Sequence, residues 1–578
     1  MEYFGMAARP IDVKQNDVRF RGVVLGAAFG DAMGWPNEGR AQNTSTSPKA
    51  SLRFVEWVKR SGGRFQPHEE HIPAGTYSDD TQLIIAGGRA RLHYSQWWRY
   101  FAQVELPLWT LYERGGGGAS LRAARLWLKG SPPWNSSLAD RSRYFEAGGN
   151  GVAMRVAPHV LVGINDGFDS IGKEIIANGV TTHGHPEALV GSLVYGYALW
   201  YALRNTRTLD YGEILRVLLK NQAAWSTWPD IEAYWPDWLT EAKNHGFEEK
   251  WSTAISDILV RLEIGLEGLE VGALSFDHET MQKLGCFRKD IGGAGGVAAS
   301  AAIYLASRHA AGPLEGVLTA AYAKGSDTDT IASMTGALSG AISGVEWMGS
   351  LMSDVQDARF LMKFASSLAA GPTNLLDVFA PITPKKVSSL IAEIASGSEQ
   401  ISLPLGFPKN ARSVNFVRSK SQNLKSQSWL VDGHGEATIV VKKLSKAKSA
   451  KRDGETQQMF EYSPIEQPVG EIAAIAGICL LSADINRSVW FYNELLGLPI
   501  LSRSQGQVRL DQQLVLRQQD GKQSTGAGTI IYLRHQKIDA CIQRLHQAGI
   551  GAADTSNGSR KKISCVDPDG RTVEIIPY

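Results

Sequence analysis

Two short acidic runs, far apart in the chain, constrain the fold more than any other feature. Ser78-Asp79-Asp80-Thr81 stands near the start, and Asp327-Thr328-Asp329-Thr330 follows roughly 250 residues later. Each run leads directly into an apolar stretch of small residues that is typical of a helix. Carboxylates crowded this closely repel one another, so a packed site must neutralise them by protonation or with a cation. All the donors are oxygen atoms, which favours a hard divalent ion such as Mg²⁺ over zinc.

Length and charge bound the class of protein. At 578 residues the chain is too long for one core, and its net charge of +2 does not indicate a nucleic-acid binder as a whole. The four cysteines form no CxxC pair, which is typical of reduced thiols in a cytoplasmic protein. The run 331–352 resembles a membrane span, but it contains Ser333, Ser339, Ser343 and Glu346. We therefore interpret it as a buried core helix and expect no membrane association.

Residues 18–395 are predicted to form one helical domain. Apolar residues recur there at intervals of three and four, and strict alternation is scarce. The predicted helices are 22–34, 80–92, 187–203, 211–221, 251–266, 297–311 and 331–347. The loop 114–135 is rich in Gly, Pro and Trp, and long loops inside a compact domain usually serve a site.

Residues 396–470 are predicted to form a basic, partly flexible linker. Lysine and arginine cluster between Lys442 and Arg452 among Ser, Gln and Ala, which favours a solvated segment. Contact with a nucleic acid or an acidic partner is the alternative, limited to this segment. A short strand pair around 437–441 is also compatible with the pattern.

Residues 471–578 are predicted to form a separate α+β domain. A strand, a helix and several short strands follow one another twice, so we expect paired βαβββ units. The second unit ends in a hairpin around Asp567-Pro568-Asp569-Gly570, where Pro and Gly suit a tight turn.

Small residues also mark the first predicted helix. Gly26, Ala27, Gly30 and Gly34 would let this helix approach another backbone closely, and Glu38 follows on the loop beyond it. Each acidic run alone would be an ordinary helix cap. The two runs together with Glu38, however, have the ligand count of a two-ion oxygen site, which can orient a substrate and polarise attacking and leaving oxygens.

Five motifs in order resemble the ADP-ribosylglycohydrolase family over roughly residues 18–380. They are Gly30-Asp31-Ala32-Met33-Gly34 with Glu38, Tyr77-Ser78-Asp79-Asp80-Thr81, the loop 148–158, the segment 182–188, and Gly325-Ser326-Asp327-Thr328-Asp329-Thr330. Ser78 stands where the family usually has Thr. The resemblance implies an all-α domain that binds an ADP-ribosyl group over two Mg²⁺ ions, with Mn²⁺ as the alternative metal.

The resemblance also implies roles for individual residues. The metal ligands would be Ser78, Asp79, Asp80, Asp327, Asp329 and Thr330, and the proton relay would be Glu38, Asp79 or Asp80. The residues along the bound ADP-ribosyl group would be Gly115, Gly116, Gly117, Gly118, Gly148, Gly149, Asn150, Gly151, Met154 and His183. Glycine N–H groups suit phosphate, and His183 is alternatively an ordinary core histidine.

The tail, 474–578, resembles the vicinal oxygen chelate superfamily, which contains glyoxalases and bleomycin-resistance proteins. The residues that carry this resemblance lie in 484–498 and 567–574. Gly477 stands where catalytic members have a metal-binding His, and Glu574 stands where a closing carboxylate usually lies. One ligand does not hold a metal, so we expect no metal chemistry here but a docking module, with a small-molecule pocket or a dimerisation surface as alternatives.

The resulting prediction is a multidomain Mg²⁺-dependent hydrolase. It would remove ADP-ribose from a modified protein or other macromolecule by cleaving an N- or O-glycosidic bond at the anomeric carbon, with free ADP-ribose as product. The alternative is a non-catalytic ADP-ribose-binding protein whose tail docks a partner or sequesters a small molecule.

Overall fold

The computed structural model of the protein divides the chain into two compact units, Met1–Glu455 and Thr456–Tyr578. In the first unit it describes residues 11–38, 52–62, 66–228, 230–272, 276–397, 410–421, 424–432 and 436–446. In the second it describes residues 478–482, 484–496, 498, 500–504, 507–510, 514–518, 530–535, 538–554, 563–568 and 571–577.

The first unit is mostly helical, as the sequence predicts. Its helices are α1 (Val13–Gly34), α2 (Asp79–His93), α3 (Trp97–Tyr100), α4 (Leu106–Trp109), α5 (Gly118–Leu128), α6 (Leu138–Phe145), α7 (Ala157–Val162), α8 (Phe168–Gly179), α9 (Pro186–Arg204), α10 (Glu213–Lys220), α11 (Gln222–Ser226), α12 (Trp238–Lys243), α13 (Phe247–Glu270), α14 (Asp277–Leu284), α15 (Gly295–Arg308), α16 (Pro313–Ala321), α17 (Thr328–Ser343), α18 (Ala358–Ala370) and α19 (Pro384–Ala395). Shorter turns include η2 (Trp35–Asn37), η4 (Phe101–Glu105), η5 (Pro133–Asn135), η6 (Ala153–Arg155) and η8 (Glu346–Asp354).

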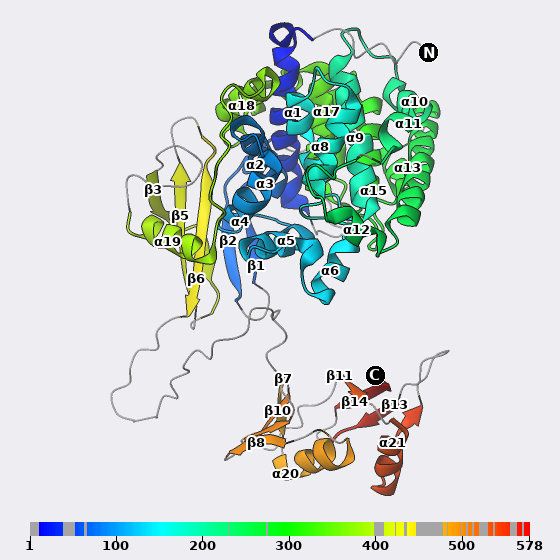
Figure 1. Ribbon diagram of the computed structural model, residues 1–578, viewed down its shortest axis with the longest axis vertical. Helices are drawn as coiled ribbons and strands as arrows, with labels where there is room; N and C mark the ends of the chain where they lie inside the picture. The colour runs from blue at the N-terminus through cyan, green and yellow to red at the C-terminus, as the bar shows by residue number, and fades with distance from the viewer. Residues whose placement is uncertain are drawn as a thin grey trace. The chain divides into compact units, whose positions relative to one another are not determined.

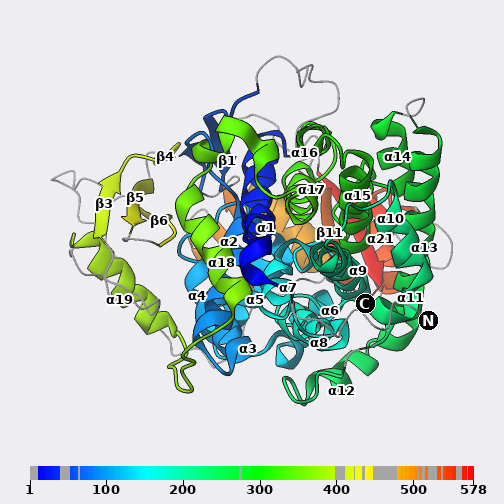
Figure 2. The same ribbon diagram turned by 90° about the horizontal axis from the view of Figure 1, so that it is seen from above.

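Helices α1 and α17 pack backbone against backbone at the centre of this unit (Figures 1 and 2). A Cβ atom added to Gly26 would lie 2.3 Å from the carbonyl oxygen of Gly336, and one added to Gly30 would lie 2.0 Å from that of Ala332. One added to Gly34 would lie 2.1 Å from the carbonyl oxygen of Thr328. Because these glycines recur every four residues, they form one face of α1, and the predicted close approach is confirmed.

Helix α17 is buried along nearly its whole length, from Thr328 to Ala341. It ends at Ser343, because Gly344 has a φ of 74° that a continuing helix does not accept. The first part of the run 331–352 is therefore the predicted core helix, whereas residues 344–352 follow it as a separate, partly exposed segment. No helix among the described residues has the length and apolar character needed to cross a membrane.

Two small sheets flank the helices of the first unit. One contains β1 (Trp57–Ser61), β2 (His68–Ile72) and β4 (Val417–Ser419), with β2 in the middle. The other contains β3 (Asn410–Val414), β5 (Leu424–Asp432) and β6 (Ile439–Lys446), with β5 in the middle. All the pairings are antiparallel. Figure 1 shows the strands from 410–446, drawn in yellow, beside the helical core.

The sheet differs from the linker predicted for 396–470. Trp429, Val431, Ile439 and Val441 are buried in the same core as the helices, so the described part of this stretch, 410–446, belongs to the first unit. Side chains alternate between the two faces of a strand, so charged residues such as Lys443 stand beside core residues. Composition averaged over a window hides that alternation. The rest of the predicted linker, 398–409 and 447–470, lies outside the described residues.

The second unit contains two βαβββ repeats, which confirms the predicted architecture. The first repeat is β7 (Ile478–Ser482), α20 (Ile485–Val489) continued by η9 (Trp490–Leu495), β8 (Ile500–Ser504), β9 (Gln507–Leu510) and β10 (Leu514–Gln518). The second is β11 (Ile530–His535), α21 (Ile538–Gln547), β12 (Ala553–Asp554), β13 (Ile563–Val566) and β14 (Thr572–Pro577). Their sheets have the equivalent orders β7-β10-β9-β8 and β11-β14-β13-β12. Gly477 lies outside the described residues, and Glu574 lies in β14.

Candidate active site

The two acidic runs meet at the N-terminal ends of α2 and α17. Thr330 Oγ1 donates a hydrogen bond to Asp80 Oδ2 over 3.3 Å, although the two residues are 250 positions apart in the chain. Ser78 is the N-cap of α2, and its hydroxyl accepts a hydrogen bond from the Asp80 N–H. Asp80 Oδ1 is buried and has no hydrogen-bond partner. The close packing of α1 against α17 therefore brings together the residues that the sequence places far apart.

Asp31 on α1 fixes the first run in position. Its carboxylate accepts hydrogen bonds from the Ser78 N–H at 2.8 Å, the Thr81 N–H at 3.1 Å and Thr81 Oγ1 at 2.7 Å. In the sequence, Asp31 lies within the first family motif, and no role is predicted for it. The available signal is a single carboxylate within a run of small, apolar residues. Such a run is buried, and a buried carboxylate needs dedicated hydrogen-bond partners.

The buried carboxylates strongly disfavour one another's charge. Burial raises the pKa of Asp79, Asp80 and Asp329 well above their usual range, and repulsion from neighbouring carboxylates raises it further. Burial raises the pKa of Asp31 to about 6, although its hydrogen bonds act in the opposite direction. A cation would relieve this repulsion, which agrees with the requirement drawn from the sequence.

Asp327 connects the second run to the loop Gly148–Gly151. Asn150 Nδ2 donates a 2.9 Å hydrogen bond to Asp327 Oδ2, and the Asn150 N–H donates to the carbonyl of Gly293 over 3.0 Å. The Gly148 carbonyl accepts from the Gly295 N–H over 3.0 Å, so two hydrogen bonds pair the loop with the segment 293–295. The side-chain nitrogen of Asn150 is thus bonded to the acidic cluster, and the loop Gly148–Gly151 lies directly beside this cluster.

A buried arginine, Arg155, holds the end of the loop Gly148–Gly151. Arg155 Nη1 donates to the carbonyl of Gly151 at 2.5 Å, and Nη2 donates to Thr182 Oγ1 at 2.8 Å. Burial lowers the pKa of Arg155 to about 9. Met154 precedes it in the turn η6, is buried, and donates its N–H to the carbonyl of Asn150. These contacts give Arg155 a supporting role that the sequence analysis did not assign.

His183 is a neutral, oriented side chain. Burial lowers its pKa to about 3, and the charges of Arg155 and Arg122 lower it further. Thr182 Oγ1 lies 2.8 Å from Nδ1, accepts from Arg155 and donates to the carbonyl of Gly179 over 3.4 Å. Nδ1 is thus engaged by Thr182. A Cβ atom added to Gly149 would lie 3.7 Å from Nε2, so this second ring nitrogen faces the loop Gly148–Gly151.

The loop Gly115–Gly118 lies on the other side of the acidic cluster. A Cβ atom added to Gly115, which has a φ of 95°, would lie 3.0 Å from Asp79 Oδ1 and 3.2 Å from Trp35 Nε1. Trp35 Nε1 is buried without a hydrogen-bond partner. The loop leads into α5, whose N-cap is Gly117, and a Cβ atom there would meet nothing within 4 Å. A helix N-terminus with open space before it favours an anionic ligand.

Glu38 lies at the edge of the cluster, immediately after the turn η2. The residue is exposed as a whole, but its carboxyl group is partly desolvated and feels the charges of Asp327, Lys59 and Asp31. Burial raises the pKa of this carboxyl group to about 7, and the charge of Asp327 raises it while that of Lys59 lowers it. It is therefore the candidate carboxyl group that combines access to solvent with a pKa near neutrality.

The chemistry of these donors fits a hard divalent cation. The acidic runs offer carboxylate and hydroxyl oxygens, and Asp80 Oδ1 is a buried oxygen without a partner. Within the described ranges, no three His, Cys, Asp or Glu side chains are arranged so that they could hold a metal ion together. The argument that the site suits a divalent cation therefore depends on the oxygen donors, on the unpartnered Asp80 oxygen and on the raised pKa values. The assignment of all six predicted ligands stays a proposal.

The sequence pattern that defines the ADP-ribosylglycohydrolases matches residues 13–375, which is more than half of the chain. The chain belongs to the ADP-ribosylglycohydrolase family. The match ends before strands β3–β6, so this family member carries a sheet and a second unit beyond the family segment.

Solved structures similar to parts of this family member have low identity to it. One described as an ADP-ribosylglycohydrolase-related protein complex is 21% identical, with 62% of this chain and 99% of that chain covered and a TM-score of 0.40. Others match the C-terminal region, whose sequence resembles the vicinal oxygen chelate superfamily. A lactoylglutathione lyase from Agrobacterium tumefaciens is 18% identical over 18% of this chain and 94% of its own (TM-score 0.16). An antibiotic binding protein from Streptomyces sp. CB03234 is 19% identical over 18% and 96% (TM-score 0.17). No curated protein matches the chain.

Proposed function

We propose that this protein is a Mg²⁺-dependent hydrolase that removes ADP-ribose from a modified macromolecule. The observation that carries the proposal is the contact between the two acidic runs, Thr330 Oγ1 on Asp80 Oδ2, in a chain of this family. Buried carboxylates with strongly raised pKa values are unfavourable in a merely structural core. Their cost is understandable when the cluster holds cations and stabilises a reacting sugar.

The metal would be held by Ser78, Asp79, Asp80, Asp327, Asp329 and Thr330. When bound, two Mg²⁺ ions would supply positive charge that orients ribose hydroxyls and makes a bound water more acidic. Asp31 would keep the first run in register, because it holds Ser78 and Thr81 through backbone and side-chain hydrogen bonds. Asn150 would do the same for Asp327.

The two glycine loops would bind the rest of the ADP-ribosyl group. The N–H groups of Gly117 and Gly118 begin α5 and are suited to a diphosphate oxygen. His183 would form a hydrogen bond through Nε2 with a ligand along Gly148–Gly151, because the ring is neutral and its Nδ1 is occupied by Thr182. Both loops border the acidic cluster, so a ligand that contacts both would present its ribose to the carboxylates.

Glu38 would exchange the proton with the attacking water. A carboxyl group with a pKa near 7 is present in both protonation states at neutral pH, which suits a proton relay. Asp79 and Asp80 are buried and serve better as ligands. Negative charge around the sugar would stabilise the positive charge that develops at the anomeric carbon as the bond to the acceptor breaks.

The test is release of free ADP-ribose from a panel of conjugates. Purified protein would be incubated with Mg²⁺ and ADP-ribosyl-arginine, ADP-ribosyl-serine, an acetyl ester, a nucleobase conjugate and the polymer. We expect release from at least one conjugate, inhibition by a chelator and recovery with Mg²⁺. Asp80→Asn should abolish release, whereas Asp169→Asn, an exposed aspartate on α8, should leave it unchanged. Binding of ADP-ribose without release from any conjugate would support a binding protein instead.

A further inference from the structure

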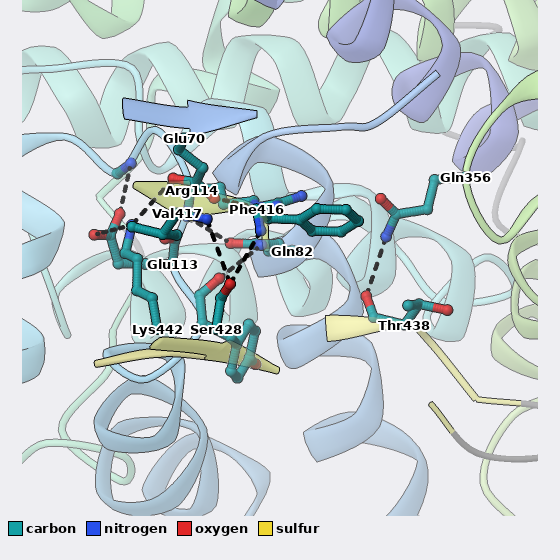
Figure 3. Close-up of polar contacts among 12 residues, drawn as sticks. Glu70, Gln82, Glu113, Arg114, Gln356, Phe416, Val417, Ser428, Thr438 and Lys442 are labelled. Atoms are coloured by element: carbon teal, nitrogen blue, oxygen red, sulfur yellow. Dashed lines mark hydrogen bonds and ion pairs between the residues drawn. The ribbon is translucent and has the colours of Figure 1, made fainter. Parts of the chain in front are cut away.

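The sheet β3–β5–β6 contacts the candidate site although it lies outside the matched segment 13–375. Lys442 of β6 reaches across to the chain just before the loop Gly115–Gly118 (Figure 3). Its Nζ donates to the carbonyl oxygen of Glu113 over 3.2 Å and lies 3.7 Å from Glu113 Oε1. It also lies 3.5 Å from Glu70 Oε2. One ammonium group therefore serves two carboxylates and a backbone carbonyl.

Glu70 and Arg114 complete this network. Glu70 is 1% exposed, and its Oε1 accepts a 2.8 Å hydrogen bond from Arg114 Nε. The Arg114 N–H donates to Gln82 Oε1 over 3.3 Å, which ties the same segment to α2 (Figure 3). Without Lys442, Glu70 would keep the charges of Arg114 and Lys59, and Glu113 would lose the ammonium group that it shares with Glu70. Like charges that lose their common counter-ion in a buried position repel and move apart.

The network reaches the glycine loop through Glu113. Glu113 Oε2 accepts a hydrogen bond from the Gly116 N–H over 3.3 Å, so the position of this carboxylate sets the start of the loop. The next contact is with the acidic cluster, because Gly115 packs against Asp79 Oδ1 and Trp35. A shift of Glu113 would therefore change the direction of the Gly117 and Gly118 N–H groups that begin α5.

The sheet itself is firmly attached near the first acidic run. The Thr438 N–H and Oγ1 donate to the two carboxylate oxygens of Asp357 over 2.8 and 2.7 Å. Tyr77, which precedes Ser78, donates its hydroxyl to Asp357 Oδ2 over 2.9 Å. The sheet is thus anchored to the same segment that carries Asp79 and Asp80, which gives Lys442 a rigid base.

We propose that Lys442 is a positioning residue that holds the loop Gly115–Gly118 in the conformation that binds the diphosphate of an ADP-ribosyl group. This inference rests on the proposed function for the identity of the ligand. It assigns a role to the sheet 410–446: the sheet supports ligand binding from outside the family segment. Lys442 acts through Glu113 and has no part in the proton transfer.

The test compares Lys442→Met with two matched variants in the full-length protein. Lys442→Met keeps most of the stem and removes the charge. Lys443→Met makes the same change at the next position of β6, where the side chain is exposed. Lys442→Arg keeps the charge, so its ADP-ribose affinity and KM should stay close to those of the wild type. The measurements are ADP-ribose affinity by calorimetry with Mg²⁺ present, steady-state kinetics, and hydrogen exchange of peptides that cover 112–120.

We expect Lys442→Met to weaken ADP-ribose affinity and raise KM by about tenfold, the range expected for a hydrogen bond to a charged group at a partly buried site. The value of kcat should change by less than about twofold, because the reacting groups are not moved. Exchange at 115–118 should become faster in this variant only. Lys443→Met should match the wild type in all three measurements.

Unchanged exchange at 115–118 in Lys442→Met would overturn the inference, whatever the ligand is. A loss of about tenfold in kcat with no change in KM or affinity would also overturn the inference, since this would indicate damage to the reacting groups. If the wild-type protein binds no ADP-ribose, the proposed function fails and the diphosphate assignment fails with it. Faster exchange in Lys442→Met would in that case still support the contact between Lys442 and the loop.

Discussion

The contact between α1 and α17 makes a sharp prediction, because glycines of α1 lie directly against the α17 backbone and Asp31 of the same helix holds the first acidic run. Gly26 lies five residues before Asp31 and touches none of the proposed ligands. In Gly26→Ala the new Cβ atom would lie 2.3 Å from the Gly336 carbonyl oxygen and 2.8 Å from its carbon, both in the backbone. Ordinary contact begins at 3.4 Å, so the two helices must separate by about 1 Å.

That separation has two consequences of different size. Overpacking of a rigid core costs roughly 1–3 kcal/mol of unfolding free energy, which a large domain survives. The activity should suffer more, because a misplacement of about 1 Å at a catalytic centre can cost about 100-fold in rate. The hydrogen bond from Thr330 Oγ1 to Asp80 Oδ2 is already 3.3 Å long and would be broken.

The assay compares Gly26→Ala with Gly87→Ala. Gly87 is also buried in a helix, α2, but a Cβ atom there would meet only Pro158 Cγ at 3.9 Å. Gly87→Ala should therefore be neutral or stabilising by about 0.5–1 kcal/mol. Denaturant unfolding gives the stability of each variant, and calorimetry and kinetics give Mg²⁺ affinity and kcat/KM. Full activity of a folded Gly26→Ala protein would refute the reasoning that helix contact sets the distance between the acidic runs.

Three further predictions concern single side chains. Asp80→Asn should abolish the rise in melting temperature that Mg²⁺ gives the wild type, measured by calorimetry with and without the ion, because it removes the charge of the carboxylate whose buried Oδ1 has no hydrogen-bond partner. Arg155→Met should cost about 2–3 kcal/mol in denaturant unfolding, since it leaves the buried Asn178 Oδ1 and Gly151 carbonyl without their donor. Burial acts to raise the pKa of Glu70, but Arg114 and Lys442 lower it overall. Its stabilisation is therefore complete above the unfolded pKa of about 4.3 and is lost as pH falls through the lower folded pKa, so the melting temperature of Glu70→Gln should depend less on pH in that acidic range.

The sequence predicted the parts of the site whose reasons are local. The residue types of Asp79-Asp80 and Asp327-Asp329 alone indicate carboxylate oxygens. The four-residue spacing of Gly26, Gly30 and Gly34 is likewise visible without a structure. The helical domain and the paired βαβββ units follow from periodicity, and each was confirmed. The metal ligands and ligand-binding residues remain predictions, although the runs that contain them lie together.

The parts that sequence analysis missed depend on partners far along the chain. Lys442 belongs to a basic segment and was assigned to a solvated linker, because its counter-ions Glu70 and Glu113 are more than 300 positions away. Asp31 was given no role for the same reason, since the groups that it holds begin at Ser78. Local composition describes how a side chain would behave in water. It does not reveal which distant carboxylate or N–H group will meet it in the fold.

The pairing of β2 with β4 has a practical consequence for work on this protein. Residues Glu70, Glu69 and His68 pair with 417–419, beyond the end of the family segment at 375. A chain shortened to the family boundary would leave one edge of β2 open and Glu70 without Lys442. Open strand edges recruit other chains, so such a fragment should aggregate even though every residue of the family pattern is present. An expression boundary after Lys446 would keep that edge covered.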